Sequence, residues 1–133
     1  MSNANVALVQ SMYAAFGRGE IATIVGALTP DVKWESVGRA TDYPGFGSRK
    51  GQGAVEEFFS IVGQNLTFTE FSPKEFYAVD DKVFVLGHYA MTMKKNGRKH
   101  ASDWIHVFTI RGGKVVQFRE FSDTAQAAEA FRD

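Results

Sequence analysis

The fold is decided by residues 82–122, which read KVFVLGHYAMTMKKNGRKHASDWIHVFTIRGGKVVQFREFS. The pairs Asn96-Gly97 and Gly112-Gly113 divide this stretch, and such pairs favour tight two-residue hairpin turns. The residues between them are rich in β-branched and aromatic side chains, which favour strands. The stretch therefore predicts three consecutive antiparallel strands, at 82–94, 99–111 and 114–122.

The residues before this stretch predict mainly helices. Apolar side chains recur at helical spacing between Val6 and Phe16, Ser2 or Asn3 can cap this helix, and Gly17 and Gly19 end it. The other expected elements are a helix over 21–28 that Pro30 stops, a strand over 32–37, a loop over 38–50, a helix over 53–63, a strand over 66–79 and a short helix over 124–131. This order favours one α+β domain over residues 1–133, with helices covering one face of a curved antiparallel sheet.

The composition limits the possible functions. Fifteen basic residues balance fifteen acidic ones, so the basic excess of a nucleic-acid binder is missing and no nucleic-acid partner is expected. There is no cysteine, and His88, His100 and His106 lack the spacing of metal ligands, so neither a metal nor another cofactor is expected. No apolar run is long enough for a membrane span and no signal peptide is recognisable. A soluble cytoplasmic protein is the expectation.

The two hairpin turns also predict which side chains share a face of the sheet. If both loops have two residues, His106 lies opposite Gly87 on one side and Arg119 on the other. One face then carries Tyr89, Met91, Ser102, Trp104, His106, Phe108, Gln117, Arg119, Phe121 and Asp123. The other carries Phe84, Leu86, His88, Asp103, Ile105, Val107, Phe118 and Glu120. The first face resembles a small-molecule pocket and the second suits a subunit interface. A β-bulge in the last strand would shift its pairing by one residue.

Three segments carry a resemblance to a known family. These are Tyr13-Ala14-Ala15-Phe16-Gly17-Arg18-Gly19-Glu20 with the following 28–35, the segment 51–59, and the run 103–125. In this order they resemble the SnoaL-like branch of the nuclear transport factor 2-like superfamily. The resemblance implies a cone-shaped curved antiparallel sheet wrapped around three helices, a cystatin-like half barrel with an internal apolar pocket, usually in a homodimer. Relatives include ketosteroid isomerase, polyketide cyclases and limonene-type epoxide hydrolases, so the fold alone does not assign a reaction.

The resemblance can be carried to individual positions. The general-base aspartate of ketosteroid isomerase falls on Ser36, its oxyanion tyrosine falls on Met12 beside Tyr13, and its second oxyanion donor falls on His106. Because a serine hydroxyl cannot replace the carboxylate base, steroid isomerisation by that mechanism is not expected. His106 and Asp123 resemble the imidazole and carboxylate of the polyketide cyclases. The Arg and Asp pair of the epoxide hydrolases has no counterpart in residues 86–90.

These considerations give one expected site with open alternatives. His106 would move a proton, Arg119 would steady negative charge and Asp123 would support the imidazole. Alternatively His106 is a buried structural histidine, Arg119 pairs within the core and Asp123 caps the last helix. A catalytic His106 requires a ring nitrogen that is free toward an open pocket. The expected ligand-binding residues are Tyr13, Trp34, Ser36, Phe59, Tyr89, Trp104 and Phe121.

Two classes of function remain. The first is a cofactor-free acid–base enzyme, an isomerase, cyclase or related lyase, acting on an apolar carbonyl-bearing or polyketide-like compound. The second is a ligand-binding or dimerisation module without catalysis. In both, the expected partners are a small apolar ligand and a second copy of the chain.

Overall fold

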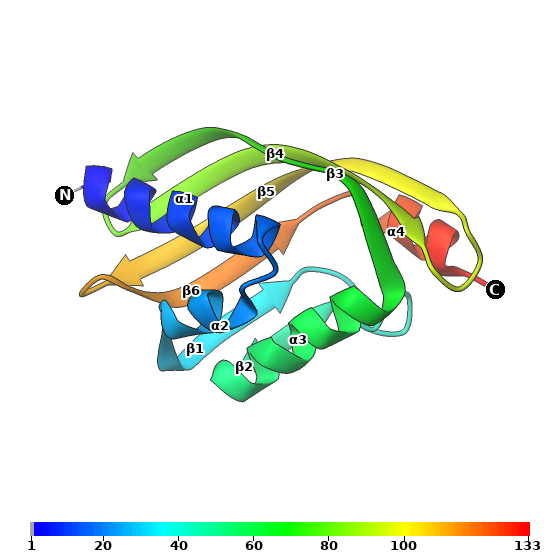
Figure 1. Ribbon diagram of the computed structural model, residues 1–133, viewed down its shortest axis with the longest axis horizontal. Helices are drawn as coiled ribbons and strands as arrows, with labels where there is room; N and C mark the ends of the chain where they lie inside the picture. Colours follow the sequence, from blue (N-terminus) through cyan, green and yellow to red (C-terminus); the bar gives the residue numbers. More distant parts are fainter. Residues whose placement is uncertain (1) are drawn as a thin grey trace.

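A curved six-stranded sheet forms the body of the molecule, shown in Figure 1 as a computed structural model that describes residues 2–133. The strand order is β2-β1-β6-β5-β4-β3. The strands are β1 (Leu28–Ser36), β2 (Gly47–Lys50), β3 (Leu66–Val79), β4 (Lys82–Met93), β5 (Lys99–Arg111) and β6 (Lys114–Phe121). The expected α+β class is confirmed. All neighbouring strands are antiparallel except β1 and β6, which are parallel, so the sheet is mixed rather than purely antiparallel.

Four helices accompany the sheet. They are α1 (Ser2–Gly17), α2 (Ile21–Gly26), α3 (Gln52–Asn65) and α4 (Thr124–Phe131). Helix α1 packs on β3 and β4, and α3 packs on β1, so the two helices cover different halves of the same side of the sheet (Figure 1). Helix α4 lies at one end of the sheet beside the β4–β5 hairpin.

The first helix follows its predicted pattern. Val9, Met12 and Ala15 are buried at helical spacing, and the chain leaves the helix through Gly19, whose φ is +72°. The predicted capping by Ser2 or Asn3 concerns side chains that lie outside the described residues. Within residues 2–133, no helix is long and apolar enough to cross a membrane.

Several predicted bounds in the first half of the chain are wrong. The second helix ends at Gly26, and Pro30 lies inside β1 instead of terminating a helix. Proline is tolerated there because the pairing of β1 with β6 is interrupted between Leu28 and Lys33, so its missing N–H leaves no gap in the ladder. The expected loop 38–50 contains the short edge strand β2, which pairs with residues 33–36 of β1. A four-residue strand that begins with Gly47 and is followed by Gly51 carries too little hydrophobic pattern to be recognised from the sequence.

The β4–β5 hairpin differs from its prediction by two residues. The turn spans four residues: the N–H of Met93 donates to the carbonyl of Arg98, and Gly97 has φ +72°. Gly87 therefore lies opposite Trp104, and Val85 lies opposite His106. Because the shift is an even number, every side chain of these two strands stays on its predicted face.

The β5–β6 hairpin contains a β-bulge, and this bulge makes part of the predicted strand pairing wrong. Near the turn Ile110 pairs with Val115, but the next pair is Thr109 with Gln117, so Val116 is an extra residue. Beyond this bulge His106 lies opposite Glu120, not Arg119. The faces of β6 are thereby exchanged: Phe118 and Glu120 point toward the helices, and Arg119 and Phe121 lie on the outer face.

Candidate functional site

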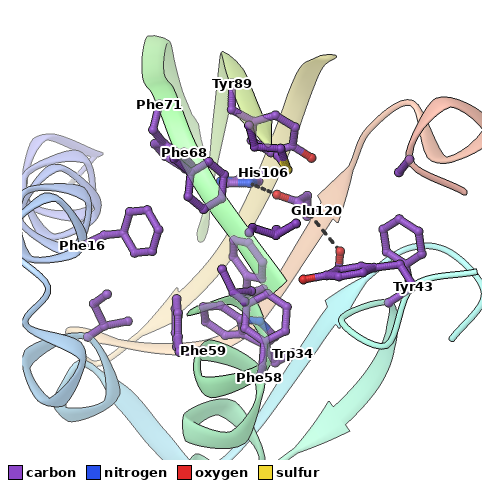
Figure 2. Close-up of a pocket in the computed structure, with 18 of the residues that line it drawn as sticks. Phe16, Trp34, Tyr43, Phe58, Phe59, Phe68, Phe71, Tyr89, His106 and Glu120 are labelled. Atoms are coloured by element: carbon purple, nitrogen blue, oxygen red, sulfur yellow. Dashed lines mark hydrogen bonds and ion pairs between the residues drawn. The ribbon is translucent and has the colours of Figure 1, made fainter. Parts of the chain in front are cut away.

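A cavity of about 110 Å³ lies between the sheet and the helices. A water molecule needs about 10–15 Å³ by the same measure, so the cavity has room for a small organic molecule. Its walls are mostly aromatic, from Phe16, Trp34, Phe58, Phe59, Phe68, Phe71, Phe108 and Phe118. In Figure 2, Phe16, Phe58 and Phe59 form one side, and Tyr43 approaches Glu120 from another. The cavity is therefore apolar with a polar region around Glu120.

Four polar side chains from four elements form one hydrogen-bonded chain at this cavity. The Tyr13 hydroxyl of α1 lies 2.7 Å from Nδ1 of His106 on β5. Nε2 of His106 lies 2.7 Å from Oε2 of Glu120 on β6, and the Ser36 hydroxyl of β1 donates to Oε1 of Glu120 at 2.9 Å. One of the dashed lines in Figure 2 marks the contact between His106 and Glu120. Two of these residues, His106 and Ser36, thus meet at the carboxylate of Glu120, and Tyr13 is joined to it through His106.

The orientation of His106 is fixed by close packing. Trp104 stacks on the imidazole with ring centroids 3.8 Å apart and an angle of 20° between the planes. Gly87, opposite Trp104 on β4, makes this possible, because a Cβ at that position would lie 2.3 Å from the indole ring. The ring of Tyr13 is nearly parallel to the imidazole, with an angle of 14° between the planes. The imidazole of His106 is therefore held by the rings of Trp104 and Tyr13.

The electrostatics of the chain favour an ionised Glu120. Burial raises the pKa of this carboxyl group, but the hydrogen bond and charge of His106, together with the hydrogen bond from Ser36, hold the pKa below its ordinary value. Burial and the nearby charge of Glu120 raise the pKa of Tyr13, so its phenol keeps its proton. Nε2–H of His106 thus donates to a carboxylate, and the side chain of Glu120, 15% exposed, presents this carboxylate to the cavity.

The structure brings most of the predicted ligand-binding residues together. Tyr13, Trp34, Ser36, Phe59 and Tyr89 all line the cavity, as does His106. Trp104 is buried behind His106 and supports it from that position. Both ring nitrogens of His106 have partners, Tyr13 and Glu120, so the free nitrogen that direct catalysis by His106 requires is missing among the described residues.

Three predicted residues lie away from the cavity. Arg119 is on the outer face, where its Nε donates to Glu35 at 2.9 Å and its guanidinium lies 4.7 Å from the ring of Phe121. Phe121 is 37% exposed. Asp123 caps α4 by accepting a hydrogen bond from the N–H of Gln126, which is the alternative considered from the sequence. The placement of Arg119 and Phe121 in the pocket was wrong because the bulge at Val116 reverses the faces of β6.

Three polar residues that line the cavity were not predicted from the sequence: Glu120, His100 and Tyr43. The sequence predicts Glu120 on the outer face, because the bulge at Val116, which exchanges the faces of β6, is not included in the predicted pairing. His100 shares the face of Ser102 and His106 by simple alternation along β5, and this signal could have identified it. Tyr43 comes from the irregular segment before β2, where no periodicity predicts orientation. Within residues 2–133 no three His, Asp or Glu side chains come together as a metal site requires.

Comparison with known families places this fold and cavity in a defined class. The sequence profile described as the SnoaL-like domain matches residues 9–118, which is most of the chain. The protein therefore belongs to the SnoaL-like domain family. No curated protein matches the chain significantly.

Several solved structures are similar over nearly the whole length. An NTF2-like protein from Burkholderia xenovorans LB400 is 27% identical with a TM-score of 0.90, and the match covers 99% of this chain and 98% of that one. An NTF2-like protein of unknown function from Burkholderia pseudomallei K96243 is 29% identical with a TM-score of 0.88 and is matched over 100% of both chains. TerC, co-crystallised with polyporic acid, is 26% identical with a TM-score of 0.86, covering 98% of this chain and 99% of its own.

Proposed function

We propose that this protein binds a small, largely apolar, carbonyl-bearing compound and catalyses cofactor-free proton transfer on it. The carboxylate of Glu120 takes and returns the proton. The observation that carries this proposal is the placement of Glu120: one carboxylate facing an aromatic cavity and held by His106 and Ser36. Aromatic walls bind the body of such a ligand, and a single oriented charge decides where it reacts.

The state of Glu120 narrows the substrate class. A carboxylate whose pKa is held below the ordinary value is a weak base. It suits carbon acids that are already activated by a carbonyl or an aryl group, as in polyketide-like compounds. His106 and Tyr13 act as positioning residues here, because they fix the carboxylate and do not need to contact the ligand.

The relatives support a ligand of this kind. TerC was co-crystallised with polyporic acid. The aromatic cavity of the present chain is suited to planar rings. Steroid isomerisation through a carboxylate on β1 is not proposed, because Ser36 occupies that position and is engaged with Glu120.

Exchange of an α-proton tests the proposal without knowledge of the natural substrate. The probe is 2-tetralone in D2O, whose C1 protons are activated by both the ketone and the ring. We expect the protein to accelerate the replacement of these protons by deuterium, followed by proton NMR. Glu120→Gln should reduce the acceleration by about 10²–10⁴-fold, the usual contribution of a positioned general base.

The control for this experiment is Arg119→Gln, which changes the neighbouring residue on the outer face and should leave exchange unchanged. Binding of 2-tetralone is followed in parallel by tryptophan fluorescence, to which Trp34 in the cavity wall contributes. Unchanged exchange in Glu120→Gln would overturn the assignment of the base.

A second candidate is a ligand-binding protein without catalysis. One observation favours this candidate: both ring nitrogens of His106 are hydrogen-bonded to protein groups, Tyr13 and Glu120. The hydrogen-bonded chain can therefore serve to stabilise the fold without taking part in a reaction. Binding of 2-tetralone with no accelerated exchange would favour this candidate.

A further inference from the structure

Four buried side-chain polar atoms have no hydrogen-bond partner among the described residues, and three of them belong to residues that line the cavity: Nε2 of His100, the hydroxyl of Tyr43 and Nε1 of Trp34. The fourth is Nε1 of Trp104. His100 is 2% exposed and Tyr43 is 7% exposed. A buried polar group without a partner costs free energy, so most such groups in proteins find one. The common location of His100 and Tyr43 in one cavity suggests that a bound molecule provides their partners.

The tautomer of His100 can be deduced from its other ring nitrogen. Nδ1 lies 2.9 Å from Oε1 of Gln126. This oxygen is identified by the backbone N–H of Ala101, which also donates to it, while the amide nitrogen of Gln126 lies 3.4 Å from a carboxylate oxygen of Asp123. Because Oε1 only accepts, Nδ1 of His100 must carry the hydrogen. In the neutral ring, Nε2 is then an acceptor.

The surroundings of His100 keep the ring neutral. Burial lowers its pKa, although the hydrogen bond to Gln126 and the charges of Asp123 and Glu120 oppose this shift. The ring of Tyr89 also faces His100, with centroids 6.1 Å apart. At neutral pH the cavity wall therefore offers a hydrogen-bond acceptor at His100.

Tyr43 offers the complementary donor. Its ring is held edge-on by Phe46 and Phe131, each with centroids 5.2 Å away. Arg49 donates to the carbonyls of Pro44 and Gly45 and fixes the segment that carries Tyr43. Burial and the charge of Glu120 raise the pKa of Tyr43, so its hydroxyl keeps a hydrogen to donate.

We propose that His100 and Tyr43 form a binding subsite for an oxygenated ligand: Nε2 of His100 accepts a hydrogen bond from a phenolic or enolic hydroxyl, and the Tyr43 hydroxyl donates to a carbonyl oxygen. This rests on the proposed function insofar as the same cavity must bind the ligand. It goes further by defining the substrate as a hydroxylated carbonyl compound and by naming the residues that select it. A methyl ether or an unsubstituted ring cannot satisfy His100.

The test compares three ketones that share one skeleton: 2-tetralone, 6-hydroxy-2-tetralone and 6-methoxy-2-tetralone. Dissociation constants are measured by titration calorimetry. We expect the wild type to bind the hydroxyl compound at least about tenfold more tightly than the methoxy compound, the difference that one hydrogen bond makes when its loss leaves a buried group unpaired. His100→Phe should reduce this ratio to about one. Tyr43→Phe should weaken all three ketones several-fold.

The matched control is His88→Phe, which removes a histidine from the outer face and should leave the ratio unchanged. A second measurement does not depend on any variant: the ring-nitrogen chemical shifts of His100, read by proton–nitrogen NMR, should show hydrogen on Nδ1 and none on Nε2. Hydrogen on Nε2 would overturn the proposal, as would a wild-type ratio near one.

The experiment separates the two proposals. If the ketones bind and exchange their protons but the ratio is near one, the subsite is wrong and the proposed function stands. If the hydroxyl preference is present and depends on His100 while Glu120→Gln leaves exchange unchanged, the subsite stands and the assigned base is wrong. If no ketone binds, both are wrong.

Discussion

Glu120 links the stability of the fold to the chemistry of the cavity. Its carboxylate accepts hydrogen bonds from His106 and Ser36, so three strands converge on one ionised group. Neither bond was visible in the sequence, because Glu120 was assigned to the opposite face. The face of the sheet that carries His106 was predicted correctly, because the register error in the β4–β5 hairpin is two residues and an even error leaves every side chain on its face.

The lowered pKa of Glu120 predicts how stability depends on pH. In the folded state the carboxyl group loses its proton at a lower pH than in the unfolded chain, whose ordinary value is 4.5. The unfolded state therefore binds more protons in this range, and the stabilisation is complete above the ordinary value and is lost as pH falls through the folded value. Glu120→Gln should flatten the fall in the free energy of unfolding below about pH 4.5. Urea titrations at a series of pH values measure this.

The matched control for the pH experiment is Glu56→Gln, which removes an exposed carboxylate from α3. It should leave the pH profile as in the wild type. A profile for Glu120→Gln that is as steep as that of the wild type would show that other carboxylates dominate the acid sensitivity.

Gly87 gives a second prediction that concerns a single residue. An added methyl group would lie 2.3 Å from Trp104 and 2.7 Å from the backbone oxygen of Ser72, and backbone cannot move aside easily. Gly87→Ala should lower the free energy of unfolding by about 1–3 kcal/mol, the usual cost of overpacking. Gly63→Ala in α3 meets open space and should raise it by about 0.5–1 kcal/mol. Thermal and urea unfolding of both variants provides the comparison, and equal effects would contradict it.

At the scale of elements, the sequence predicted the long strands and the helices well, because alternation and helical spacing are local signals. Strands β3 to β6 and helix α4 lie within about one residue of their predicted bounds. Register was less predictable. The bulge at Val116 has no glycine to announce it, and the wider β4–β5 turn depends on tertiary contacts of Asn96. The single bulged residue Val116 decides whether Arg119 or Glu120 faces the cavity.

The contacts of Asn96 predict how α4 is held. Its side-chain amide donates to the carbonyls of Ala130 and Arg132 at the end of α4, and its Oδ1 accepts from the N–H of Arg98. Asn96→Asp keeps the acceptor and removes the donors. We expect a local destabilisation of about 0.5–1.5 kcal/mol per lost bond, read as faster hydrogen exchange in α4 with little change in the central strands.

Gln64→Glu is the matched control for this change, because the exposed amide of Gln64 contacts only Ser60 on its own helix. It should leave exchange in α4 unaffected. Equal protection of α4 in Asn96→Asp and the wild type would show that the contacts of the ring of Phe131 hold the helix.

On the scale of the whole molecule, the outer face of the sheet remains without a partner among the described residues. Leu86, Ile105 and Phe121 lie side by side across β4, β5 and β6, and Ile105 and Phe121 are 42% and 37% exposed. Such an apolar row is typical of interfaces. The homodimer expected from the sequence stays a prediction, as does a cytoplasmic location.

Phe121→Glu tests the dimer. Charge in the centre of an apolar interface is costly to desolvate, so the variant should shift the molar mass in solution from two chains to one. Light scattering coupled to size-exclusion chromatography measures the mass. Glu56→Lys, a charge change on exposed α3, is the control and should leave the mass unchanged. A wild type with the mass of one chain would contradict the prediction.

The bulge in β6 has a consequence for how this family can diverge. Arg119 and Glu120 are adjacent and oppositely charged, and the extra residue Val116 decides which of them faces inward. If the bulge were lost while the number of residues stayed the same, each residue beyond it would move to the other face, and Arg119 would take the place of Glu120 opposite His106 with no substitution at either position. Deletion of Val116 itself would have no such effect, because it would remove the bulge and leave Glu120 opposite His106. New specificity in such a fold can therefore arise from a one-residue slip in strand register as readily as from a change of side chain.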